Sequence, residues 1–167
     1  MLQSEGFLHQ AWTIANLYLG SIDADLLGEQ APRIAGLSQE TTCFVSLRYF
    51  EEDDPFADFV VHEAAHIFHN CKRATLRLPH MRRREWLLEI AFQKRETFAY
   101  ACEAYSRIVE RKVGSAERAG LVEQYAAGPM PSDESVAAEE VVDILRAAVG
   151  ARNGWKKILE RCGAHRR

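Results

Sequence analysis

The chain has 167 residues, of which 47% are hydrophobic and 27% are charged. These proportions are ordinary for a globular protein and exclude a collagen-like fibre, a largely disordered chain and a small disulfide-stapled module. The net charge is −3, but residues 1–70 carry 2 basic and 11 acidic side chains, whereas residues 71–118 carry 12 basic and 6 acidic ones. Opposite charges in successive segments indicate a match within one molecule, and a pI of about 6.1 argues against a nucleic-acid binder.

The sequence shows no targeting or membrane-spanning segment. No basic stretch followed by an apolar run opens the chain, and no run of 18 apolar residues occurs anywhere in it. The four cysteines, Cys43, Cys71, Cys102 and Cys162, lack the C-x-x-C spacing of zinc or redox sites. We therefore expect a cytoplasmic protein with reduced thiols.

The first part of the chain predicts two helices and one strand. Ser4 can cap a helix that continues to Leu19, and a short helix is expected over Asp23–Gln30. Residues Thr41–Phe50 alternate between apolar and polar side chains, which is typical of a strand with one buried face. Because a lone strand is unstable, it needs a partner, for which residues 33–37 are the nearby candidate.

The rest of the chain predicts helices. A run of acids before Pro55 indicates a helix start, with Asp54 as the N-cap and the helix continuing to Cys71. Further helices are expected over Met81–Lys112 (as one helix or two stacked ones), Ser115–Ala127, Asp133–Val149 and Gly154–Arg161. The predicted fold is mainly α with a minimal β element (α+β), in a single domain over residues 1–167.

Residues His62-Glu63-Ala64-Ala65-His66 form the pattern H-E-x-x-H. On a helix, positions i and i+4 lie one turn apart on the same face, so His62 and His66 can bind one metal ion. Glu63 lies beside them and can act as a general base toward water activated by that metal. The pattern therefore predicts a zinc site with Glu63 as its catalytic residue.

The residues around this motif are almost all apolar, which is typical of a buried helix. Burying two imidazoles and a carboxylate without partners would cost several kcal/mol, and a zinc ion with its water would supply those partners. The alternative is that the three side chains make ordinary hydrogen bonds in the core.

A catalytic zinc site needs a third protein ligand and an open position. Lys72 stands where the extended zincin motif has its third histidine. His69 shares the face of His66 one turn later, but three ligands from one straight helix would crowd a tetrahedral site. We therefore expect His69 to be a neighbour of the ligands or a surface residue.

Glutamates recur every seven residues farther along the chain and share one helix face. Glu89 follows a basic cluster, and Glu110 lies near the expected helix end. Glu103 has Arg107 one turn later, which favours a surface pair. Glu96 opens an apolar run and is expected to be buried with a partner. Spacing alone does not decide among the four.

This combination resembles the gluzincin zinc metallopeptidases, in which His-Glu-x-x-His is followed by a glutamate that opens an E-x-x-A pattern on a later helix. Here that pattern reads Glu96-Thr97-Phe98-Ala99 and begins 30 residues after His66. The resemblance covers about residues 42–106. It implies that His62, His66 and Glu96 bind Zn2+, with Glu63 as the general base. It also implies a zincin-like two-helix core within about 42–112, followed by a helical part over 115–162.

Many gluzincins hold the first histidine with an aspartate four residues after the glutamate ligand, and here that position is Tyr100. Asp58 and Glu103 are the candidates for this acceptor role, which zinc-bound histidines require. By residue type, Tyr100, Tyr105 and His80 are candidate donors to an oxyanion. For the two tyrosines, core packing with a hydrogen-bonded hydroxyl is the favoured interpretation.

The resemblance implies a small metallopeptidase that acts on a peptide or protein substrate, with the strand over Thr41–Phe50 as the docking edge. Two other classes stay open. One is a zinc-binding or metal-free interaction protein, for which the basic stretch Lys72–Arg84 is a candidate surface. The other is a metallo-hydrolase of a non-peptide substrate. Neither the cleavage specificity nor the oligomeric state follows from the sequence.

Overall fold

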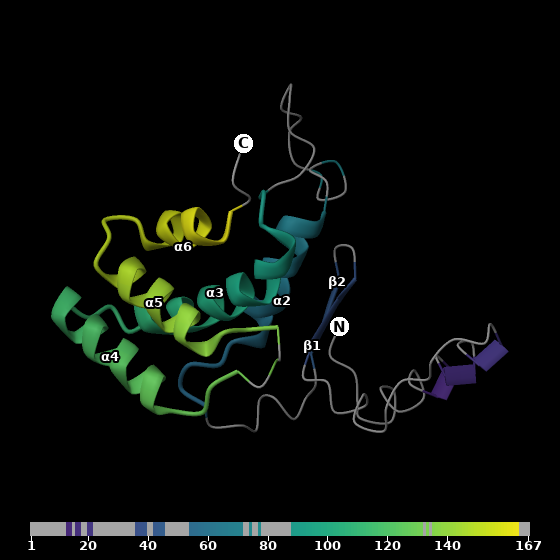
Figure 1. Cartoon of the computed structure of the whole chain (residues 1–167), viewed down its shortest axis with the longest axis horizontal. Coiled ribbons are helices and arrows are strands. Elements are labelled where there is room, and N and C mark those ends of the chain that lie inside the picture. The colour runs from purple at the N-terminus through teal and green to yellow at the C-terminus, as the bar shows by residue number, and fades with distance from the viewer. Residues whose placement is uncertain are drawn as a thin grey trace.

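The computed structural model describes three continuous stretches, residues 54–71, 88–131 and 135–163, together with 13, 14, 16, 17, 20, 21, 36–39, 42–45, 74, 77 and 133 (Figure 1). The fold of this part is mainly helical, as the sequence predicts. The described residues between 13 and 21 are helical. The rest of the predicted helix over 4–19, and the helix predicted over 23–30, lie outside the described residues.

A short antiparallel hairpin precedes the helices. Strand β1 (Gly36–Gln39) pairs with β2 (Thr42–Val45), with Gly36 opposite Val45 and Gln39 opposite Thr42. The described strand falls within the predicted Thr41–Phe50, and its partner begins three residues later than expected. Both strands contact helix α2 (Phe59–Asn70), beside which the hairpin lies in Figure 1.

Helix α2 carries the H-E-x-x-H motif and begins later than predicted. Its N-cap is Asp58, whose Oδ1 accepts a hydrogen bond from the backbone N–H of Val61. Asp54 was expected to cap this helix, but its Oδ1 accepts from the N–H of Phe56 in a local turn. The helix is also less buried than its composition predicts, since Val60 and Phe68 are about half exposed.

Helix α3 (Arg95–Glu110) follows a short 3-10 turn, η3 (Phe92–Lys94). The predicted helix over Met81–Lys112 is therefore wrong for residues 88–94. Ile90 pairs with Gly163 in an isolated bridge, and the N–H of Ala91 donates to the carbonyl of Cys162 at 2.9 Å. These long-range backbone contacts hold the segment before α3 in an extended conformation.

Three helices complete the described part: α4 (Ser115–Ala127), α5 (Ala138–Val149) and α6 (Gly154–Cys162). The bounds of α4 match the prediction, and α5 begins five residues later than predicted. Helix α3 lies at the centre and contacts α2, α4, α5 and α6 (Figure 1). No described helix is long and apolar enough to cross a membrane.

The core of the described residues is built mainly by α3, α4, α5 and α6. Ile108, Ile144, Leu145 and Ile158 are fully buried there, and each such side chain contributes about 1.5–3 kcal/mol relative to an exposed one. Ala99 on α3 is also fully buried. Small residues on α3 let its neighbours approach closely, and this packing fixes the distance between α3 and the motif on α2.

Candidate metal centre

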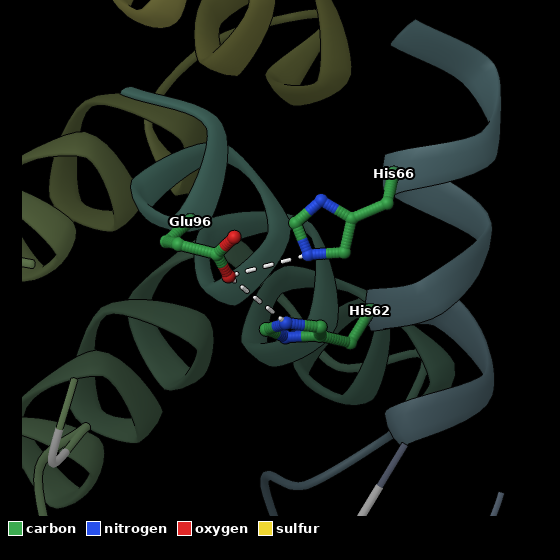
Figure 2. Close-up of side chains that lie close together, drawn as sticks. All are labelled: His62, His66 and Glu96. Carbon is green, nitrogen blue, oxygen red and sulfur yellow. Dashed lines mark ion pairs between the residues drawn. The ribbon is translucent and has the colours of Figure 1, made fainter. Parts of the chain in front are cut away.

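Three side chains from two helices converge on one point. His62 and His66 project from α2, one turn apart, and Glu96 projects from the first turn of α3. Oε2 of Glu96 lies 3.6 Å from Nε2 of His62 and 3.2 Å from Nε2 of His66. Figure 2 shows both imidazole rings turned toward this carboxylate. The two histidines are buried, whereas the side chain of Glu96 is 35% exposed, so the cluster is accessible from the side of the glutamate.

The spacing of these atoms suits a tetrahedral zinc ion. With zinc–nitrogen and zinc–oxygen distances of about 2.0–2.2 Å, two ligand atoms of a tetrahedron lie about 3.3–3.6 Å apart. The two measured separations, 3.6 and 3.2 Å, agree with this edge length, and the three ligand atoms all lie within 4.8 Å of one another. Two imidazole nitrogens and one carboxylate oxygen are also a donor set that catalytic zinc uses, leaving one position for water.

Glu103 orients the first of these histidines. Its Oε2 lies 3.1 Å from Nδ1 of His62, and its Oε1 accepts a hydrogen bond from the backbone N–H of Asp58 at 2.7 Å. Glu103 is 4% exposed, so the predicted surface pair with Arg107 is wrong. Arg107 instead contacts Glu110. With Nδ1–H donating to a carboxylate, Nε2 of His62 is free to bind a metal.

His66 has a different partner. Its Nδ1 lies 3.2 Å from Nε2 of His69, which is itself buried and packs edge-on against Phe98. Burial and the neighbouring charge of His66 lower the pKa of His69 to about 4, so its imidazole is neutral at physiological pH. Of the two interpretations from sequence, His69 is therefore the neighbour of a candidate ligand, not a surface residue.

The ionisable side chains of this cluster shift one another's pKa values. Burial lowers the pKa of His62, but the carboxylates of Glu103 and Glu96 outweigh this effect and raise it to about 9. The imidazoles of His62 and His66 hold the pKa of Glu96 well below its usual range. A proton on His62 thus takes the place that a metal cation would fill, because both compensate the same carboxylates.

Glu63 follows His62 in α2 and is 6% exposed. Its charge contributes to the raised pKa of both His62 and Tyr100, so its carboxylate lies in the electrostatic field of the cluster. The sequence-predicted general base is thus near the candidate ligands and shielded from bulk water.

Tyr100 is the only one of the three predicted oxyanion donors that the described residues place at the cluster. Its ring packs edge-on against His62, with 4.6 Å between the centroids. Burial and the surrounding acids raise the pKa of its hydroxyl to about 12, so the group stays a donor. Tyr105 packs against Trp155 at the start of α6 instead, and His80 lies outside the described residues.

The other glutamates of the seven-residue series lie apart from the cluster. Glu110 is exposed near the end of α3, as predicted, and forms an ion pair with Arg107 at 3.0 Å. Glu89 is exposed in the non-helical segment before η3. The carboxylate of Asp58 caps α2, and its N–H donates to Glu103. Of the two candidate acceptors for the His62 imidazole, Glu103 therefore takes the role and Asp58 contacts His62 only through the backbone, where its carbonyl accepts the His62 N–H at 2.9 Å.

Comparisons with protein-family models, with curated proteins and with solved structures give no match for this chain.

Proposed function

We propose that this protein is a zinc-dependent hydrolase, and most specifically a small gluzincin-like metallopeptidase. The observation that carries the proposal is the convergence of His62 Nε2, His66 Nε2 and Glu96 Oε2 within 4.8 Å of one another. The H-E-x-x-H spacing adds a carboxylate, Glu63, next to the first histidine.

Each residue of the candidate site has its own proposed role. His62, His66 and Glu96 hold the ion, and Glu103 fixes the orientation of His62. When bound, zinc supplies a Lewis acid that polarises the substrate carbonyl and makes water more acidic. Glu63 accepts the proton of the attacking water and returns it to the leaving amine. The protonated hydroxyl of Tyr100, beside His62, is the candidate donor to the oxygen that becomes negative.

The proposed substrate is a peptide or protein in extended conformation. The hairpin of β1 and β2 lies beside α2, and the edge of a sheet next to the active-site helix can pair with an extended chain through backbone hydrogen bonds. We also propose that the protein is cytoplasmic. Cys102 and Cys162 are buried thiols that form no disulfide, as is usual in a reducing compartment.

The test compares the wild-type protein with Glu63→Gln, after zinc content has been measured for both. Both should hold zinc equally, because Glu63 is not a ligand. Hydrolysis of casein or a peptide library should fall about 10²–10⁴-fold in the variant, since the general base is lost. Glu139→Gln, an exposed acid on α5, is the matched control and should leave both properties unchanged. Undiminished hydrolysis by Glu63→Gln would refute the proposed mechanism. Zinc binding without hydrolysis by the wild type would favour a non-catalytic zinc protein.

A further inference from the structure

The two candidate ligands on α2 are supported by chemically different partners. His62 contacts the Glu103 carboxylate, whereas His66 contacts the imidazole of His69 at 3.2 Å. His69 follows His66 by three residues, so it is on the same face of α2, and it is only 7% exposed. A buried imidazole pair of this kind is costly unless each polar atom is used.

The direction of the hydrogen bond between the two rings in the metal-bound protein follows from the proposed role of His66 as a ligand. A contact of 3.2 Å between two ring nitrogens requires one nitrogen to donate and the other to accept. Nε2 of His66 faces Glu96, where the metal would bind, so this nitrogen must be unprotonated in the metal-bound protein. The proton of the neutral His66 ring then resides on Nδ1. Nδ1–H consequently donates to Nε2 of His69, which acts as the acceptor.

The position of His69 is itself fixed by its surroundings. Its ring packs edge-on against both His66 and Phe98. The acceptor for His66 is therefore held by ring packing from α2 and α3. A ligand whose second nitrogen has such a fixed partner loses little rotational freedom when it binds a metal.

We propose that His69 is a positioning residue for the metal centre, which fixes the tautomer and ring orientation of His66 without binding the metal itself. This inference rests on the proposed zinc site. His69 is the third histidine of the H-E-x-x-H-x-x-H stretch, and its role would be to hold the candidate ligand His66 in place. The two ligands on α2 would then differ in donor strength, because a carboxylate acceptor makes an imidazole more basic than a neutral imidazole acceptor does.

The experiment measures the zinc dissociation constant of the full chain by competition with a chromophoric chelator, together with the absorption spectrum of the Co2+-loaded protein. Wild type is measured first, so that an absence of zinc binding is recognised as failure of the proposed function. His69→Ala should then weaken zinc binding about 10–100-fold and alter the Co2+ spectrum. His69→Gln, whose amide oxygen can accept the same hydrogen bond, should recover most of the affinity. Phe68→Ala, a change at the exposed neighbour, should stay within about twofold of wild type.

Two results would overturn the assignment of His69 even though the wild-type protein binds zinc. One is His69→Ala with wild-type affinity and an unchanged Co2+ spectrum. The other is a loss of zinc binding in His69→Ala that His69→Gln does not restore, combined with normal binding by Glu96→Ala, since His69 would then be the third ligand. Because His69→Gln keeps the volume and polarity of the site, its unfolding curve separates a folding defect from a change in the metal centre.

Discussion

Oε2 of Glu103 lies 3.1 Å from Nδ1 of His62, although 41 residues separate them in the chain. The same carboxylate accepts the N–H of Asp58 through its other oxygen, so it joins α3 to the first turn of α2. One buried side chain therefore both connects the two helices and orients a candidate ligand.

Replacing Glu103 should damage stability and metal binding together. Glu103→Ala leaves the N–H of Asp58 and the Nδ1–H of His62 without a buried acceptor. Each unsatisfied donor should lower the free energy of unfolding by about 1–3 kcal/mol. Zinc affinity should fall about 10–100-fold as His62 loses its orientation. Urea unfolding of the metal-free protein and chelator competition measure the two effects separately.

Glu110→Ala is the matched control for Glu103, because it removes a glutamate one seven-residue step later whose side chain is 67% exposed. It should change the unfolding free energy by less than about 1 kcal/mol and leave zinc affinity unaltered. Equal effects of the two substitutions would show that Glu103 has no special role.

Glu96 and Glu103 should respond differently to substitution by glutamine. Glu96→Gln removes the charged oxygen that faces both imidazoles and should weaken zinc binding more than the about 10–100-fold expected for the loss of a supporting residue. Glu103→Gln keeps an acceptor oxygen and should have the smaller effect. Zinc titrations of the two variants check this order, and the reverse order would make Glu103 the ligand.

The stability of the metal-free protein should depend on pH through the cluster. The pKa of His62 is raised from its ordinary 6.5 to about 9, so its contribution is fully present below about pH 6.5 and is lost as the pH rises through 9. The pKa of Glu96 is lowered from 4.5, so its contribution is present above about pH 4.5 and is lost on acidification. The free energy of unfolding of the metal-free protein should thus be highest between about pH 4.5 and pH 6.5.

Urea unfolding in the presence of a chelator, at several pH values from about 4 to 9, measures this profile. His62→Gln should remove the decline on the alkaline side. With zinc bound the decline should also be absent, because the ion replaces the proton. A metal-free stability that is flat or increases between pH 6.5 and 9 would contradict the assigned cluster.

The ends of a helix could be predicted where residues next to them in the sequence determine them. Gly114 and Pro129 bound α4, and its predicted and observed ends agree. The start of α3 could not be predicted, because residues 88–94 favour a helix locally but Ile90 pairs with Gly163 far along the chain. The N-cap of α2 was misplaced for a related reason. Asp54 and Asp58 are equivalent by residue type, and the contact of the Asp58 N–H with Glu103 favours the later start.

In the candidate site, the spacing of His62 and His66 follows from helical periodicity. The apolar run after Glu96 predicts that this glutamate is buried, but its side chain is 35% exposed, and Glu103 is the buried glutamate of the seven-residue series instead. The role of Glu103 was harder to predict, because its partners lie 41 and 45 residues away, whereas Arg107 lies one turn away. The contact between His66 and His69 depends on side-chain rotation. Periodicity places the two residues on one face but does not decide whether their rings meet.

The packing of Tyr105 against the start of α6 gives a prediction that concerns the fold alone. A Cβ at Gly154 would overlap the Tyr105 hydroxyl and lie 2.7 Å from the carbonyl oxygen of Ala148. Gly154→Ala should therefore destabilise the protein by about 1–3 kcal/mol.

At Gly120, within α4, an added Cβ meets nothing within 4 Å. Gly120→Ala should stabilise by about 0.5–1 kcal/mol through helix propensity. Thermal unfolding of both variants measures the two changes in stability. An unchanged stability of Gly154→Ala would contradict the tight packing at Gly154.

The central claim is that two histidines of α2 and one glutamate of α3 hold a zinc ion. Zinc X-ray absorption spectroscopy on the purified full chain, with the metal content determined on the same sample, tests it most directly. The account predicts one zinc per chain, bound by two imidazole nitrogens and by oxygen at about 2.0–2.2 Å, with no sulfur. A chain without zinc, a sulfur ligand at about 2.3 Å, or a third imidazole in place of the carboxylate would contradict it.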